Sequence, residues 1–270
     1  MKIRVGCEFQ YEASWPTPAV LQVQPHQEAA LRICQEAWEL TPTLAQHFYK
    51  DMYGNTCQRI VISPGSQLLR YDTTVEVSGQ ADEVVPEATE LPVEALPDDV
   101  LIYTLPSRFC LSDELSDMAW QLFGGLEPGW GRVQAICDWV HSNIRFQYGS
   151  SNSRTTAADI CAQGVGVCRD FAHLGVTFCR ALNLPARYVF GYLPDIGVPP
   201  SDNPMDFCAW MEVFLGYRWY TFDPRNNQAR IGRVLIGRGR DALDVAMVTT
   251  YGSPRLVQMK VWADEVMGED

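Results

Sequence analysis

The stretch that most constrains the fold is residues 164–180, where a glycine-rich turn leads to Cys168 and then to an apolar stripe. From Cys168 onward, apolar residues that include Phe171, Ala172 and Cys179 recur at spacings of three and four, which predicts a helix with one buried face. Cys168 is then the first or second residue of this helix. Unpaired N–H groups and the helix dipole at that position can lower a thiol pKa and supply an oxyanion-binding N–H. Cys168 is therefore a candidate nucleophile, and a buried structural cysteine is the alternative.

Composition restricts the class of protein. The chain has 270 residues, of which 47% are hydrophobic, so it can fill the cores of two globular domains. The net charge is −12 and lysine and arginine form no run, so we expect no nucleic-acid partner. Charges interrupt residues 1–9, and no window approaches the apolar length of a membrane span. We expect a cytoplasmic protein that does not span a membrane.

Cysteine and histidine spacing disfavours metal and disulfide frameworks. The nine cysteines are an odd number and never form Cys-x-x-Cys, and the four histidines form no His-x-x-x-His pair. These patterns argue against a disulfide scaffold, a ribbon-type zinc site and a conventional zinc enzyme. We expect mostly reduced core cysteines and no cofactor.

The N-terminal part of the sequence predicts a β-sandwich. Polar and apolar residues alternate over residues 2–11, and strand-like runs follow at residues 20–24, 31–37, 46–50, 56–62 and 68–77, with a hairpin turn at 51–55. From residue 79 to 106 the chain is rich in Asp, Glu and Pro, as in a connecting segment. We therefore assign residues 1–104 to a β-rich N-terminal domain with an acidic linker.

Residues 105–270 form the second predicted domain. A cap signal at Ser112 precedes a helical stripe ending at Gly124, and further helices are predicted at 130–143 and 155–160. Residues 145–149 are predicted to be extended. Strands are predicted at 185–192, 207–215 and 218–223, the last two joined as an antiparallel hairpin. Helices followed by an antiparallel sheet indicate an α+β fold.

Three segments resemble the bacterial transglutaminase-like superfamily: Gly-Val-Cys-Arg-Asp-Phe-Ala-His-Leu at 166–174, Asp-Phe-Cys-Ala-Trp-Met-Glu-Val-Phe-Leu at 206–215, and Arg-Trp-Tyr-Thr-Phe-Asp-Pro-Arg at 218–225. The resemblance covers residues 105–252 and implies a papain-like core with helices packed on an antiparallel sheet, preceded by a β-rich region. It also implies a thiol nucleophile facing a His on one strand and an Asp on the next. Cys168 and Asp223 occupy the nucleophile and Asp positions.

The sequence departs from the family pattern at the general base. Cys208 stands where the family has His, and Asn226 stands where close relatives often have His after the Arg. A thiol is a weak hydrogen-bond donor and cannot repeat the acid and base work of an imidazole near neutral pH. His173 lies five residues after Cys168, points elsewhere on the helix, and is expected to be buried and hydrogen-bonded.

Strand alternation places Cys208 and Trp210 on the same face of residues 207–215. Trp210 is then either an apolar wall or a substrate contact. Tyr148, in the extended piece before the Cys168 helix, is the other candidate substrate-binding residue.

Three functions remain open at this point. Cys168 can serve a transglutaminase-like acyltransferase or amide hydrolase with an altered base, with Cys208 and Asp223 in its catalytic site. The chain can instead be a non-catalytic descendant that binds a protein or peptide in its cleft. Cys168 and Cys208 can also form a thiol pair, either a reversible disulfide or, with Asp223, a soft-metal site. The expected partners are a protein, a peptide, or an acyl thioester or amide substrate, and the sequence leaves the oligomeric state open.

Overall fold

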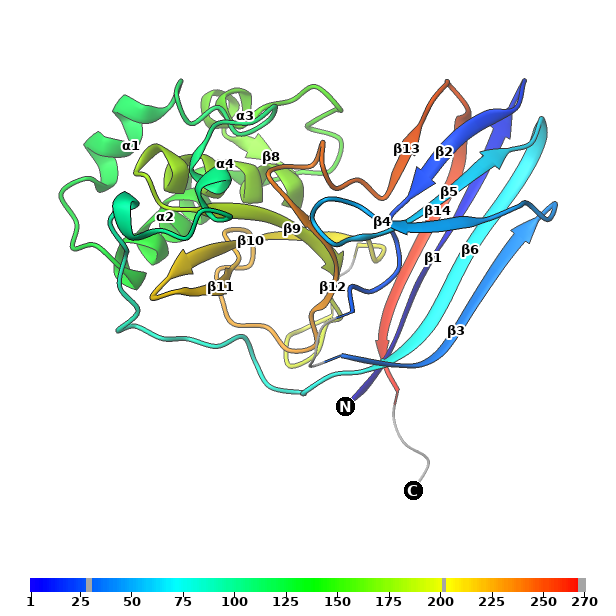
Figure 1. The fold of residues 1–270 in the computed structure, drawn as a ribbon, viewed down its shortest axis with the longest axis horizontal. Helices are drawn as coiled ribbons and strands as arrows, with labels where there is room; N and C mark the ends of the chain where they lie inside the picture. Colours follow the sequence, from blue (N-terminus) through cyan, green and yellow to red (C-terminus); the bar gives the residue numbers. More distant parts are fainter. Residues whose placement is uncertain (28–30, 201–202, 267–270) are drawn as a thin grey trace.

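Two four-stranded antiparallel sheets form one half of the protein, which the computed structural model describes over residues 1–27, 31–200 and 203–266. Alternating burial along these strands puts one face of each sheet into a shared core, as in a β-sandwich (Figure 1). The first sheet has the order β14 (Arg255–Glu265), β1 (Lys2–Ala13), β6 (Gly65–Glu76), β3 (Arg32–Thr41). The second has the order β13 (Val248–Thr250), β2 (Thr17–Leu21), β5 (Thr56–Ile62), β4 (His47–Lys50).

The last two strands belong to the sandwich sheets, so the predicted C-terminal core is too long at its end. The sequence assigns all of residues 105–270 to that core, whereas β13 pairs with β2 and β14 pairs with β1. Figure 1 shows the red strand β14 beside the blue strand β1. Local alternation identifies a strand but not the sheet that it joins, because pairing depends on contacts far along the chain.

The other half is a helical layer on a third antiparallel sheet, which confirms the predicted α+β class. The sheet has the order β11 (Arg218–Phe222), β10 (Cys208–Leu215), β9 (Ala186–Tyr192), β12 (Val234–Gly239). The helices are α1 (Ser116–Phe123), α2 (Trp130–Asn143), α3 (Ala157–Gln163) and α4 (Cys168–Ala181), with a short parallel pair β7 (Arg145–Phe146) and β8 (Val165–Gly166). Two 3₁₀ turns, η1 (Val93–Ala95) and η2 (Leu101–Thr104), lie in the segment between the halves.

Helix α2 has the predicted bounds, and α4 begins at Cys168 as predicted. Ser112 does not cap α1, which starts at residue 116 after a turn. The smallest helix, α3, has a capping box in which Thr156 and Asp159 satisfy each other's backbone N–H groups. Gly164 ends it with φ of 70°, the left-handed conformation that glycine adopts without strain.

Helix α4 differs from its prediction because it is buried on every side, not on one face. All residues from Asp170 to Ala181 are buried, since α4 lies between the sheet strands β9 and β10 and the helices α1, α2 and α3. A side chain at Gly175 would meet Met211 Sδ at 2.8 Å and Pro224 Cγ at 2.9 Å. The helix therefore packs directly onto the sheet, which fixes Cys168 relative to β10.

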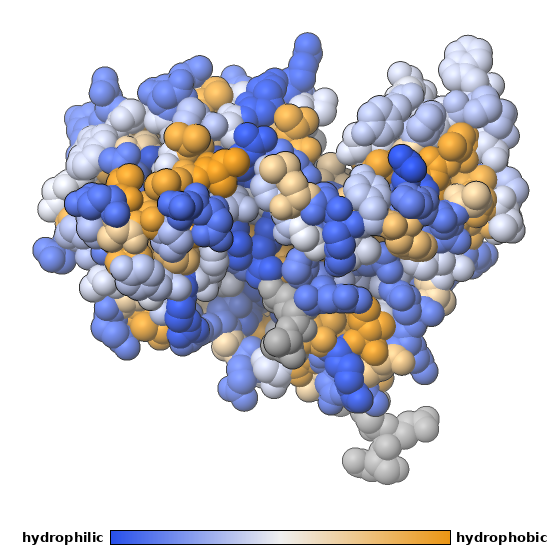
Figure 2. Space-filling view, in the orientation of Figure 1, coloured by the Kyte–Doolittle hydropathy of each residue, from blue (hydrophilic) through white to orange (hydrophobic). Residues whose placement is uncertain are grey.

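The core sheet also packs against the sandwich. Residues of β9, β10 and β12 share one apolar cluster with β1, β2, β5 and β6. On the face seen in Figure 2, hydrophilic residues spread over both halves, with smaller hydrophobic groups between them. No helix in the described part of the chain is long and apolar enough to cross a membrane.

Candidate active site

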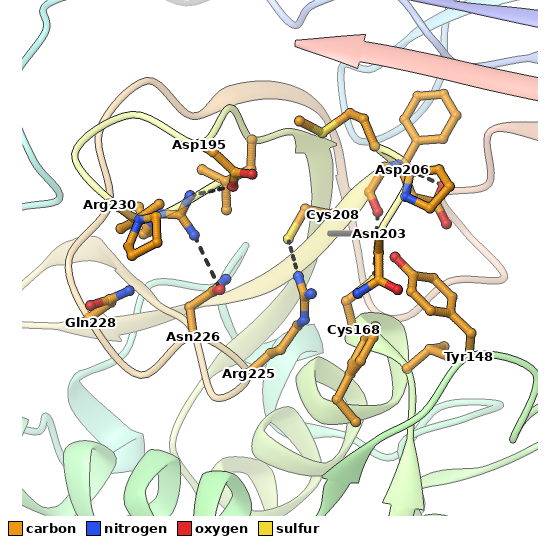
Figure 3. A pocket seen from close by; sticks show the side chains of 18 residues that line it. Tyr148, Cys168, Asp195, Asn203, Asp206, Cys208, Arg225, Asn226, Gln228 and Arg230 are labelled. Carbon is orange, nitrogen blue, oxygen red and sulfur yellow. Dashed lines mark hydrogen bonds and ion pairs between the residues drawn. The ribbon is translucent and has the colours of Figure 1, made fainter. Parts of the chain in front are cut away.

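A cavity of about 350 Å³ opens at the N-terminus of α4. Its walls come from four parts of the chain: the end of β7, the start of α4, the loop from β9 into β10, and the loop after β11 (Figure 3). Cys168 and Cys208 both line it, although 40 positions separate them in the sequence. The close packing of α4 on β10 brings these two thiols together.

The protein favours a thiolate at Cys168. A hydrogen bond from the Cys208 thiol is the largest cause that lowers the pKa of Cys168, and the charge of Arg225 and the N–H of Ala209 act in the same direction. Burial opposes them but does not outweigh them. The partner thiol behaves oppositely: its hydrogen bond to Cys168 and its burial raise the pKa of Cys208 well above the ordinary value. The pair therefore loses its first proton more readily from Cys168, while Cys208 keeps its own.

Asp223 does not line this cavity. It is buried behind Asn226, where its Oδ1 accepts the Asn226 N–H at 2.9 Å and its Oδ2 accepts Asn226 Nδ2 at 2.7 Å. Arg233 Nη2 donates to the same Oδ2 at 2.9 Å. Burial alone would raise the pKa of Asp223, but the charge of Arg233 and the Asn226 hydrogen bonds hold it below its ordinary value. The carboxylate is therefore already satisfied by an amide and a guanidinium.

Tyr148 lines the cavity, and 47% of its surface is exposed. Trp210 does not line it. It is buried in a small apolar cluster with Cys208, so the two share a face of β10 as predicted. The Arg233 guanidinium lies over the indole, 4.8 Å from the ring centroid. Trp210 is thus a wall behind Cys208, and no part of it faces the cavity.

His173 is fully buried, as predicted. Its Nε2 accepts the Ala242 N–H at 3.1 Å, and its ring stacks on Phe109 at 5.3 Å between centroids. Burial lowers the pKa of His173 to about 3, so the ring is neutral. It does not line the cavity and contributes to packing.

From the sequence, no role was assigned to four charged residues that line the cavity: Asp195, Asp206, Arg225 and Arg230. Asp206 accepts its neighbour's N–H, Phe207 N, at 2.7 Å, and burial raises its pKa. Arg225 follows the Asp-Pro pair in the third motif. Its closeness in sequence to Asp223 could therefore have indicated that it lies at the site. Arg230 had no such signal, because its position depends on how the loop after β11 folds back.

The thiol-pair alternative included a metal held by Cys168, Cys208 and Asp223. Across residues 1–27, 31–200 and 203–266, no three His, Cys, Asp or Glu side chains are grouped closely enough to hold a metal ion. The three-ligand site is therefore not assembled in this structure, whereas the two-thiol contact is.

Fold and site together define a protein with a buried central helix, a cysteine at its N-terminus and a cavity shared with the neighbouring strand. The family model of the transglutaminase-like superfamily matches residues 117–224. A crystal structure of a candidate cysteine protease from Cytophaga hutchinsonii has a TM-score of 0.90 and 31% sequence identity, covering 100% of this chain and 92% of that one. The chain belongs to the transglutaminase-like superfamily.

Two curated relatives are uncharacterized mycobacterial proteins. One, from Mycobacterium leprae, is 33% identical over 121 residues, which is 42% of each chain. The other, from Mycobacterium bovis, is 27% identical over 215 residues, 73% of this chain and 68% of that protein. The matched part is thus less than half of the M. leprae protein.

Proposed function

We propose that this chain is a cysteine acyltransferase or amide hydrolase that forms an acyl-enzyme on Cys168, with Cys208 in place of the usual base. The observation that carries this proposal is the position of Cys168 as the first residue of α4 at the wall of a cavity, and the lowered pKa of its thiol supports it. The thiolate attacks the acyl carbon, a carbon–sulfur bond forms, and the leaving group departs with its electron pair. Water or an amine then attacks the acyl-enzyme and releases Cys168.

The Cys208 thiol favours donors with good leaving groups. Because its pKa is raised, Cys208 stays protonated and cannot accept a proton as an imidazole would. An amide leaving group needs a proton on nitrogen, whereas the thiolate that leaves a thioester does not. We therefore propose acyl thioesters as the faster donors and amides as slower ones.

The remaining site residues have supporting roles in this proposal. The N-terminus of α4 offers backbone N–H groups and the helix dipole to the developing oxyanion. Asp223 acts as a positioning residue that fixes Asn226 at the cavity wall. Tyr148 contacts the substrate from the open side.

The test is intact-mass detection of an acyl adduct after incubation with a panel of acyl thioesters and glutamine amides. Cys168→Ala should abolish the adduct, whereas Cys161→Ala, which removes a half-buried cysteine of α3 outside the cavity, should retain it. An adduct on another cysteine, or none with any donor, would reject acyl transfer on Cys168. If Cys168 also fails to react selectively with electrophiles, the non-catalytic binding function is favoured.

A reversible disulfide between Cys168 and Cys208 is the second candidate, supported by their packing in one cluster at the wall of the same cavity. Oxidised glutathione would accept the two hydrogens that the thiols lose. Peptide mapping that shows no linkage between them after this treatment would exclude it. A cytoplasmic location, where thiols stay reduced, suits the free thiol that acyl transfer needs and is part of that proposal.

A further inference from the structure

Arg225 holds its guanidinium beside the two thiols at the cavity wall. Its Nη1 lies 4.0 Å from Cys208 Sγ, and its charge lowers the pKa of Cys168. The ring of Phe146 supports the group, with its centroid 4.3 Å from the guanidinium carbon. Figure 3 shows the side chain rising from the loop after β11 toward Cys208. The charge is therefore held in place next to the candidate nucleophile.

The hydrogen-bonding capacity of this guanidinium is almost unused. A guanidinium carries five N–H donors, and the Arg225 side chain donates one weak hydrogen bond, to Cys208 Sγ. Arg230, the other arginine of the cavity, has more partners: it donates to Asn226 Oδ1 at 3.2 Å and Pro194 O at 2.9 Å, and pairs with Asp195 at 3.3 Å. Among the described residues, no carboxylate forms a salt bridge with Arg225.

The opposite side of the cavity carries the opposite charge. Figure 3 shows Asp206 and Tyr148 on the other side of Cys168 from Arg225. One oxygen of Asp206 accepts Phe207 N–H, and the carboxylate forms no ion pair in the described residues. A negatively charged ligand is therefore favoured on the Arg225 side only.

We propose that Arg225 is a specificity-determining residue that binds a carboxylate on the acyl donor, close to the carbon that Cys168 attacks. A planar guanidinium matches a carboxylate with two parallel N–H···O bonds. The substrate class is then acyl donors that carry a free carboxylate, such as the C-terminus of a peptide or an acidic side chain. This inference rests on the proposed function for its substrate, but the subsite can be tested without any turnover.

The test compares two alkylating reagents of nearly equal size. Iodoacetate carries a carboxylate beside its reacting methylene, and iodoacetamide carries a neutral amide. With either one, the Cys168 sulfur forms a bond to the methylene carbon and iodide leaves. The measured quantity is the iodoacetate rate divided by the iodoacetamide rate. The fraction of Cys168 present as thiolate cancels in this ratio, because both reagents react with the same thiolate. Dividing the ratio by the one measured for a small-molecule thiol then removes the difference in intrinsic reactivity between the two reagents.

For the unaltered protein we expect a normalised iodoacetate preference of about tenfold, the scale of charge-assisted hydrogen bonds. The preference should fall in high salt. Arg225→Gln should abolish it, and Arg225→Lys, which keeps the charge without the planar fork, should give an intermediate value. Arg145→Gln removes an exposed charge just before Phe146 and is the matched control, expected to leave the ratio unchanged.

Several results would overturn the subsite. These are a normalised ratio near one in the unaltered protein, a ratio unchanged by Arg225→Gln, or a Lys variant as unselective as the Gln variant. The unaltered protein alone decides the matter if a variant does not fold, through its ratio and its salt dependence. Alkylation needs no acyl transfer. A normalised ratio near one would therefore overturn the carboxylate subsite alone, whereas the absence of an acyl-enzyme would overturn the proposed function alone.

Discussion

Replacing Cys208 with alanine removes the largest single contribution to the low pKa of Cys168. The thiolate of Cys168 accepts a hydrogen bond from Cys208, and alanine offers no donor. A hydrogen bond to a charged group contributes about 1.5–3 kcal/mol, and a thiol, as a weak donor, belongs at the lower end. Since about 1.4 kcal/mol corresponds to a tenfold change in an equilibrium constant, the loss of this hydrogen bond should raise the pKa of Cys168. Below the pKa, alkylation of Cys168 should slow by roughly tenfold.

The assay is the iodoacetamide rate at Cys168 as a function of pH, read by peptide mass in a Cys34→Ala background that removes the exposed cysteine. Cys208→Ser keeps an O–H donor and should hold the pKa near or below that of the parent. An unchanged or lowered pKa of Cys168 in Cys208→Ala would refute the role of Cys208 as a hydrogen-bond donor to Cys168. It would leave the charge of Arg225 as the main stabiliser of the thiolate.

Three further predictions follow from the same contacts. Cys208→His should raise amide turnover by only about tenfold, below the usual range for positioned acid and base groups, because Asp223 is already satisfied by Asn226. A gain above a hundredfold would contradict this reason. His173 binds a proton with a pKa of about 3 when folded, against about 6.5 when unfolded, so protonation favours unfolding between these values. In the parent protein, the free energy of unfolding should therefore fall by about 1.4 kcal/mol per pH unit as the pH drops from 6.5 toward 3. His173→Gln should remove this fall, as measured by urea unfolding at several pH values. The same pH slope in the variant would argue against the buried neutral histidine. Thr156→Ala should cost about 1 kcal/mol in the same assay, since it removes the α3 cap, and a cost near zero would show that tertiary contacts hold that helix end.

Local patterns in the sequence were sufficient for much of the architecture. The spacing of apolar residues predicted α2 with its bounds and the start of α4 at Cys168. Alternation predicted β1 and the hairpin of β10 and β11, and it placed Cys208 and Trp210 on one face. These features depend on neighbours a few positions away, which a short window contains. The class of fold and the identity of the candidate nucleophile follow from them.

The last strand, β14, shows what local patterns in the sequence cannot predict. In β14, the buried Val261 and Ala263 alternate with the more exposed Lys260, Trp262 and Asp264, as in a strand with one buried face. Even with that pattern, the pairing of β14 with β1 joins opposite ends of the chain. The burial of α4 on all sides has the same origin, because the other helices of its layer cover the face that the apolar stripe leaves polar.

The sequence by itself determined which groups are available: a thiol at a helix N-terminus, a second thiol at the base position and a carboxylate on the next strand. Only the tertiary structure decided what each group meets. It placed Cys208 against Cys168, paired Asp223 with Asn226 and Arg233, and left the guanidinium of Arg225 open to the cavity. The physical reason is that charge and hydrogen-bond partners are chosen by proximity in space, and loops after β9 and β11 bring together groups that no sequence period connects.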